Sequence, residues 1–178
     1  MAYQYKREPL TPEEANRLVN AADTHEEKLV VWVLLDTGLR VSELAGLTRK
    51  DVDWQSTPPR LVIRGKGGPY GKKSKRRVVP VVARRSRALL EGHFALHDTL
   101  GLTIRTMHRL VRRVATRAGI SRKTSPHVLR HTFSVDSIRK GVSLPALQRV
   151  LGHDHLTTTQ IYLNMSPEDA PHEYEAKW

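Results

Sequence analysis

The chain has 178 residues, which is enough for one domain with a hydrophobic core. Its 30 lysines and arginines outnumber 18 acidic residues, and this net charge of +12 indicates a polyanionic partner. The absence of cysteine excludes disulfides, cysteine-ligated zinc and thiol nucleophiles. No apolar run is long enough to span a membrane and no signal peptide is visible, so we expect a soluble, intracellular protein.

The charge is concentrated in parts of the chain. Residues 60–87 contain eleven basic residues and no acidic one, and residues 99–135 form a second arginine-rich stretch without acids. The last thirteen residues, 166–178, reverse the sign with four acids and one lysine. This distribution predicts a basic body that binds nucleic acid, followed by an acidic tail.

Helix-start signals appear near the beginning of the chain. Residues 1–10 read as a linker or chain start, and Thr11-Pro12-Glu13-Glu14 then has the pattern of a capping box with proline at the first helical position. Thr24-His25-Glu26-Glu27 repeats this pattern. The run LVVWVLL at 29–35 leaves no polar face, so we expect a central buried helix that ends at Gly38.

Two β-branched segments, RLVIRG and RVVPVV, follow and predict an antiparallel hairpin. The glycine-rich, basic sequence KGGPYGKKSK forms its tip. The remaining signals are helical, at residues 83–97, 103–118, 125–141 and 144–151, with a last short helix capped by Thr157. We therefore predict a mainly α fold with a small antiparallel sheet, of the α+β class.

Several residues with phosphate-binding chemistry lie at the ends of these elements. His127 and Arg130 are three residues apart on one predicted helix, so they share a face near its N-terminus, where an anion is favoured. Arg40 follows the buried helix, where an unpaired guanidinium would be costly, and Glu43 is its candidate partner. Two arginines and a histidine can bind the non-bridging oxygens of a phosphodiester.

Three more residues supply groups for a reaction at such a phosphodiester. Lys66 lies where the first strand enters the hairpin tip, His153 follows a predicted helix stop, and Tyr162 comes nine residues later. A tyrosine hydroxyl can attack phosphorus, and a lysine can protonate the departing oxygen. This chemistry requires no metal, and we expect no cofactor.

Four segments carry a family resemblance. TGLRVSELAGL, RGKG followed by VVP, SPHVLRHTFSV and LGHDHLTTTQIY resemble, in this order, the sequence boxes of the tyrosine recombinases, the phage integrase and Xer-type enzymes. The resemblance implies their catalytic-domain fold, related to type IB topoisomerases, over residues 11–165, with 166–178 as a C-terminal tail. It also implies a site-specific recombinase that joins DNA to tyrosine through a 3′-phosphate.

The resemblance implies six catalytic residues, namely Arg40, Lys66, His127, Arg130, His153 and Tyr162. In this interpretation Tyr162 is the nucleophile, Lys66 is the general acid, and His127 assists proton transfer at the nucleophile. The arginines and His153 bind phosphate oxygens, and Glu43 supports Arg40.

Some of these assignments have competitors within the chain. His131 directly follows Arg130 but points elsewhere on the helix, so we interpret it as structural. His155 competes with His153, and the spacing to the tyrosine favours His153. Other lysines crowd the hairpin tip and compete with Lys66, namely Lys72, Lys73 and Lys75.

The expected partner is double-stranded DNA. We expect a homotetramer on DNA and a monomer or weak dimer without it, in the cytoplasm at the nucleoid. We expect no N-terminal clamp domain, of the kind that recombinases usually have, within this chain. The alternatives are a DNA-binding module without catalysis and an RNA-binding protein, the latter disfavoured by few aromatics. The candidate DNA contacts are Lys72, Lys73, Lys75, Arg76, Arg105, Arg109 and Arg112.

Overall fold

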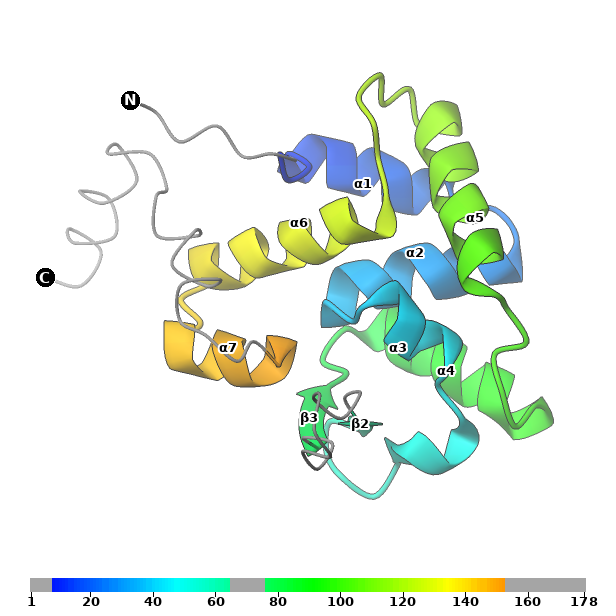
Figure 1. Ribbon diagram of the computed structural model, residues 1–178, viewed down its shortest axis with the longest axis vertical. Coiled ribbons are helices and arrows are strands. Elements are labelled where there is room, and N and C mark those ends of the chain that lie inside the picture. The colour runs from blue at the N-terminus through cyan, green and yellow to red at the C-terminus, as the bar shows by residue number, and fades with distance from the viewer. Residues whose placement is uncertain (1–7, 65–75, 153–178) are drawn as a thin grey trace, which may run out of the picture.

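The computed structural model describes residues 8–64 and 76–152, which form a mainly helical fold with one small sheet at its edge (Figure 1). The sheet is antiparallel, has the order β1-β2-β3, and consists of β1 (Val52–Asp53), β2 (Arg60–Arg64) and β3 (Arg76–Pro80). The predicted α+β class is confirmed. The helices are α1 (Pro12–Ala21), α2 (His25–Thr37), α3 (Val41–Ala45), α4 (Arg84–Leu96), α5 (Ile104–Arg117), α6 (Pro126–Arg139) and α7 (Leu144–Leu151), with a 3-10 turn η1 (Arg49–Asp51).

Both predicted capping boxes are present. The Thr11 hydroxyl accepts from the Glu14 amide at 3.2 Å, and the Glu14 carboxylate accepts from the Thr11 amide at 2.9 Å. Thr24 and Glu27 repeat the exchange at 3.2 and 3.3 Å. Each box satisfies amide groups that the first turn of a helix leaves unpaired, so both helices begin where the sequence predicted.

Helix α2 is the centre of the fold. It packs against α6, α4 and α5, as Figure 1 shows. Its residues Leu29, Val30, Val31, Val33 and Leu34 are buried, which confirms the prediction of a central helix. None of the described helices is long and apolar enough to cross a membrane.

The predicted hairpin corresponds to β2 and β3. Leu61 lies opposite Val79, and both are buried, whereas the described strands end at the exposed pair Arg64 and Arg76. The hairpin tip, residues 65–75, lies outside the described residues. Strand β1 was not predicted, because a two-residue strand shows no alternation of polar and apolar residues.

Helix α7 packs beside α6 and against β3. Its residues Leu147 and Leu151 form a small apolar cluster with Val135 that is separate from the main core. Gly152 ends α7 in the left-handed region, at φ 66°. The short helix predicted after Thr157 lies outside the described residues.

Candidate phosphate-binding site

Arg130 lies on α6, one turn after the helix start at Ser125 and Pro126. Its side chain is buried, and its guanidinium donates to two backbone carbonyls, those of Gly38 at 2.5 Å and Leu151 at 2.8 Å. These carbonyls end α2 and α7, and the C-terminus of a helix carries partial negative charge. A buried guanidinium needs such partners, so two helix ends fix its position.

Arg40 lies just before α3, and its side chain is 44% exposed. Our expectation of an arginine buried beside the apolar helix was therefore wrong. Leu39 takes the buried position after the Gly38 turn, and Arg40 points outward. The Arg40 guanidinium also donates to the Gly152 carbonyl at 3.3 Å.

Glu43 is the partner of Arg40, as the sequence suggested. Its carboxylate accepts from the Arg40 guanidinium at 2.9 Å and from the Arg40 amide at 2.7 Å. The Glu43 carboxylate thus orients the Arg40 side chain and also caps the N-terminus of α3. Since Arg40 contacts Gly152 and Arg130 contacts Leu151, the two guanidinium groups meet at the C-terminal end of α7.

The sequence analysis missed Arg77. This residue of β3 donates two hydrogen bonds to the Glu43 carboxylate, at 2.6 and 2.7 Å, and a third to the Val150 carbonyl at 2.8 Å. A signal was present, because residues alternate in a strand and Arg77 shares the inward face with the buried Val79. An arginine on a buried face indicates a carboxylate partner, but not which one.

The electrostatics of Glu43 follow from these contacts. Burial raises the pKa of its carboxyl group, but hydrogen bonds from Arg77 and Arg40 outweigh burial and lower the pKa to about 2. Glu43 is therefore ionised at neutral pH. The group of Arg40, Glu43 and Arg77 carries one net positive charge, and Arg130 adds another.

The two histidines of α6 have different environments. His127 is exposed on the first turn, three residues before Arg130. His131 is buried, and burial, followed by the neighbouring charge of His127, lowers its pKa to about 4. His131 is therefore neutral at pH 7, which supports the structural interpretation of this residue.

The remaining expected catalytic residues and the lysines of the hairpin tip lie outside the described residues. The structure thus brings together Arg40, Glu43 and Arg130, with His127 on the same helix as Arg130, and it leaves the remaining assignments as predictions. These undescribed residues are Lys66, Lys72, Lys73, Lys75, His153, His155 and Tyr162.

The arginines of α5 differ in whether they pair with an acid of the fold. Arg113 and Arg117 each pair with the buried carboxylate of Glu27 on α2, with closest distances of 2.8 Å. They hold α5 to α2, although we expected the arginines of this helix to face DNA phosphates. The three arginines of α5 that we named as DNA contacts are all exposed, namely Arg105, Arg109 and Arg112.

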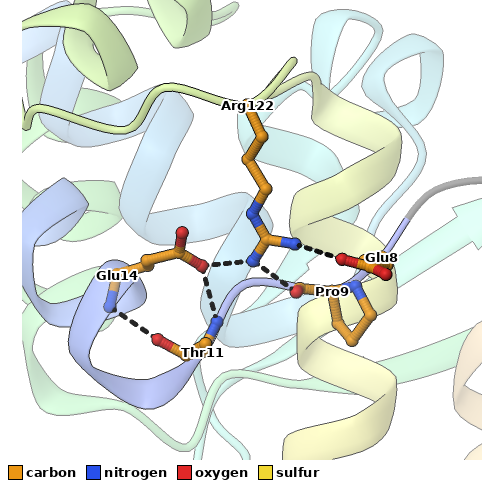
Figure 2. Close-up of a pocket in the computed structure, with 5 residues that line it drawn as sticks. All are labelled: Glu8, Pro9, Thr11, Glu14 and Arg122. Carbon is orange, nitrogen blue, oxygen red and sulfur yellow. Dashed lines mark hydrogen bonds and ion pairs between the residues drawn. The ribbon is translucent and has the colours of Figure 1, made fainter.

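Arg122 is a further structural arginine from the acid-free stretch (Figure 2). In a pocket beside α1, its guanidinium pairs with Glu14, donates to the Pro9 carbonyl at 2.6 Å and lies 3.5 Å from the Glu8 carboxylate. This contact fixes the loop that leads into α6. Within residues 8–64 and 76–152, no three histidine or acidic side chains gather in a way that could hold a metal ion.

Comparisons with known proteins find similar chains and folds. The profile of the Phage integrase family matches residues 8–169. Tyrosine recombinase XerA of Saccharolobus solfataricus is 32% identical over 158 residues, which cover 89% of this chain and 52% of that protein. Tyrosine recombinase XerC of Listeria monocytogenes is 32% identical over 161 residues, covering 84% of this chain and 53% of that protein. The chain thus spans about half the length of these relatives.

Solved structures show the same fold. A crystal structure of XerA recombinase superposes with a TM-score of 0.79 at 32% identity, covering 98% of this chain and 66% of that one. The catalytic domain of bacteriophage HP1 integrase gives a TM-score of 0.71 at 24% identity and covers 96% of this chain and 95% of that one. The chain therefore belongs to the phage integrase family, and its fold is that of a tyrosine recombinase catalytic domain.

Proposed function

We propose that this chain is the catalytic part of a site-specific DNA recombinase or integrase that cuts and rejoins strands through Tyr162. The observation that carries the proposal is the meeting of Arg40 and Arg130 at the end of α7, with Glu43 holding Arg40. Two fixed guanidinium groups suit a phosphodiester, whose two non-bridging oxygens need charge stabilisation in the transition state.

In the proposed reaction the Tyr162 hydroxyl attacks the scissile phosphorus. A bond forms between the tyrosine oxygen and phosphorus, the bond from phosphorus to the 5′ oxygen breaks, and the 3′ end stays on the protein. His127 assists removal of the tyrosine proton, and Lys66 protonates the 5′ oxygen. Attack by a 5′ hydroxyl on the phosphotyrosine reverses these steps and rejoins a strand.

The remaining groups of the site stabilise charge in this scheme. The arginines and His153 bind the non-bridging oxygens, and the chemistry needs no metal or nucleotide. The proposed partner is double-stranded DNA, bound by the basic hairpin tip and by the exposed arginines of α5. We further propose that four copies of the whole protein assemble on DNA.

Covalent capture tests this proposal. The protein is incubated with nicked duplexes and random-sequence plasmid in a buffer that contains a metal chelator. The amount of SDS-resistant protein–DNA adduct is then measured. We expect an adduct from the wild type and none from Tyr162→Phe, because phenylalanine lacks the attacking oxygen. Tyr174→Phe, which removes a hydroxyl from the acidic tail, is the matched control and should keep the adduct.

Two results would contradict the proposal. An adduct that survives in Tyr162→Phe would place the nucleophile elsewhere. Salt-sensitive DNA binding without any adduct would favour a DNA-binding module without catalysis. Joining the chain to the clamp domain of a relative before repeating the assay separates that module from a catalytic domain that needs a clamp.

A further inference from the structure

Arg77 connects three elements of the candidate site. Its side chain, like that of Glu43, is only 10% exposed. Its guanidinium group donates hydrogen bonds to both carboxylate oxygens of Glu43 on α3 and a third hydrogen bond to the Val150 carbonyl of α7. Arg77 belongs to β3, so one side chain joins the hairpin to both structures that hold Arg40.

Arg40 needs this support because it is exposed. A single ion pair at an exposed site is weak and does not immobilise a long side chain. Glu43 is the fixed acceptor that Arg40 requires, and a planar fork with two parallel bonds fixes a carboxylate better than a point charge does. Arg77 supplies this fork at 2.6 and 2.7 Å.

Charge balance gives Arg77 a second effect. Glu43 alone would cancel the charge of Arg40 and weaken its attraction for a phosphate. Because Arg77 pairs with the same carboxylate, the group retains one net positive charge next to Arg130. The negative charge of Glu43 thus orients Arg40 while the site continues to attract an anion.

The end of α7 also depends on Arg77. A Cβ atom at Gly152 would lie 2.7 Å from Cδ of Arg77, so the glycine allows the side chain to pass under the helix end. The Val150 carbonyl accepts from Arg77, and the next two carbonyls accept from Arg130 and Arg40. Three arginines therefore bind three consecutive carbonyls.

We infer that Arg77 is a positioning residue of the proposed strand-cleavage site, which fixes Glu43 and the end of α7 and thereby sets where Arg40 meets the scissile phosphate. The inference rests on the proposed function for its catalytic consequence. It does not rest on that function for its structural content, so the two are tested separately.

The structural content is tested in the DNA-free protein by NMR of arginine side chains. The Arg40 Nε–Hε signal, assigned with Arg40→Lys, should show high order in the wild type and lose it in Arg77→Met. Arg85→Met is the matched control, because Arg85 forms a similar two-bond pair with Asp36 away from the site. An Arg40 signal that keeps its order in Arg77→Met would overturn the inference.

Arg77→Lys covers the case in which the methionine variant does not fold. Lysine keeps the charge but lacks the fork, so the Arg40 signal should lose part of its order. Full order in the lysine variant would show that the bidentate geometry has no effect on Arg40 and would overturn the inference. In folded variants the amide signals of α2 should remain unchanged.

The catalytic consequence is tested by single-turnover adduct formation on saturating nicked duplex. Arg77→Met should lower the rate constant about 100-fold, as expected for a misplaced catalytic group. The DNA dissociation constant should rise much less, because the lost charge affects one phosphate contact among many. Glu43→Gln should lower the rate similarly, and the double variant should add little, because Arg77 acts through Glu43. Equal losses in Arg77→Met and Arg85→Met, or additive losses in the double variant, would overturn the inference.

The two failures remain distinguishable. If the wild type forms no adduct on any DNA, the proposed function fails while the NMR experiment still decides whether Arg77 positions Arg40. If the wild type forms the adduct and Arg77→Met forms it at the same rate, only the positioning role fails.

Discussion

Gly38 meets two requirements at one residue. It ends α2 at φ 62°, in the left-handed region, and a Cβ atom there would lie 2.3 Å from the ring of Phe133. Its carbonyl also accepts from Arg130. A side chain at this position would therefore disturb the helix end, the packing of α6 and one of the candidate phosphate ligands.

Gly38→Ala should lower the free energy of unfolding by about 3 kcal/mol, as the sum of left-handed strain and overlap with a packed ring. Gly119→Ala is the control, because Gly119 has φ 66° and open space around its Cα atom. It should cost only about 1 kcal/mol. Urea unfolding followed by circular dichroism measures both, and equal losses would show that Phe133 simply moves aside.

The sequence predicted Gly38 as the end of a helix, because this glycine closely follows an apolar run. It could not predict the contact with Phe133, which is 95 residues away in the chain. The pairing of Arg77 with Glu43 could not be predicted either, because these residues are also far apart in the chain. Local patterns identify backbone requirements, whereas the choice of a distant partner depends on the packed fold.

Helices α2 and α5 are joined by one buried carboxylate. Glu27 is fully buried and accepts from Arg113 and Arg117 on α5 and from backbone amides at its own helix start. Hydrogen bonds, first from Arg117, lower the pKa of Glu27 from 4.5 to about 2 against the opposing effect of burial. The pair of arginines therefore stabilises the ionised form.

Glu27→Gln tests this contact through its pH dependence. The folded-state pKa lies below the unfolded value, so the ionised carboxylate contributes about 3 kcal/mol above pH 4.5, and this contribution is lost as the pH falls towards 2. The stability gap between wild type and variant should be large at pH 7 and shrink at pH 3 in urea titrations. The control is Glu26→Gln, because Glu26 is the exposed neighbour of Glu27. A difference in stability between wild type and Glu27→Gln that does not change with pH would show that the Glu27 carboxylate is not its cause.

Elements with a local signature were predicted, and elements without one were not. Capping residues and apolar spacing predicted the start of α1 and both ends of α2, α5 and α6 within a few residues. Helix α3 has only five residues, too few to show a helical period, and it lies inside a segment singled out by family resemblance alone. The sequence did not predict that some α5 arginines pair with Glu27 while others remain available to DNA. Helical spacing does not show which arginine lies beside a buried acid.

The excess positive charge of the molecule falls into two sets, arginines paired with acids of the fold and arginines without an acid partner among the described residues. Arg113, Arg117 and Arg122 pair with acids of the fold, although the first two remain about half exposed. The α5 arginines named as DNA contacts are exposed and form no ion pair within the described part of the chain. Net charge alone therefore overstates the surface available to a polyanion. Only the arginines that are not paired with an acid should affect binding through release of counterions from DNA.

The proposed DNA contact predicts a specific salt dependence. Replacing Arg105, Arg109 and Arg112 together by glutamine should reduce the slope of log affinity against log salt by about 3, because each phosphate contact contributes about one unit. Arg113→Gln should lower thermal stability and leave the slope nearly unchanged. Fluorescence anisotropy with a labelled duplex at several salt concentrations measures the slope, and equal slopes for the triple variant and the wild type would remove α5 from the DNA interface.

The candidate site joins segments that lie far apart in the chain, around residues 38–43, 77, 130 and 150–152. The sequence predicted three of its members, Arg40, Glu43 and Arg130, since they fall in segments that resemble the family boxes. It did not predict that Arg130 is buried and Arg40 exposed. Those properties depend on which helix ends meet in three dimensions.

The small apolar cluster under α7 has a consequence for how the protein responds to heat. Local opening costs less where few apolar contacts are broken. Helix α7 is held by its small cluster with Leu147 and Leu151, by the partly buried Val150 and by arginines that donate to its carbonyls. When α7 detaches, Arg40 loses the Gly152 carbonyl and Arg130 loses the Leu151 carbonyl, while the core around α2 remains intact. We therefore expect the site to disassemble at a lower temperature than the melting temperature of the fold.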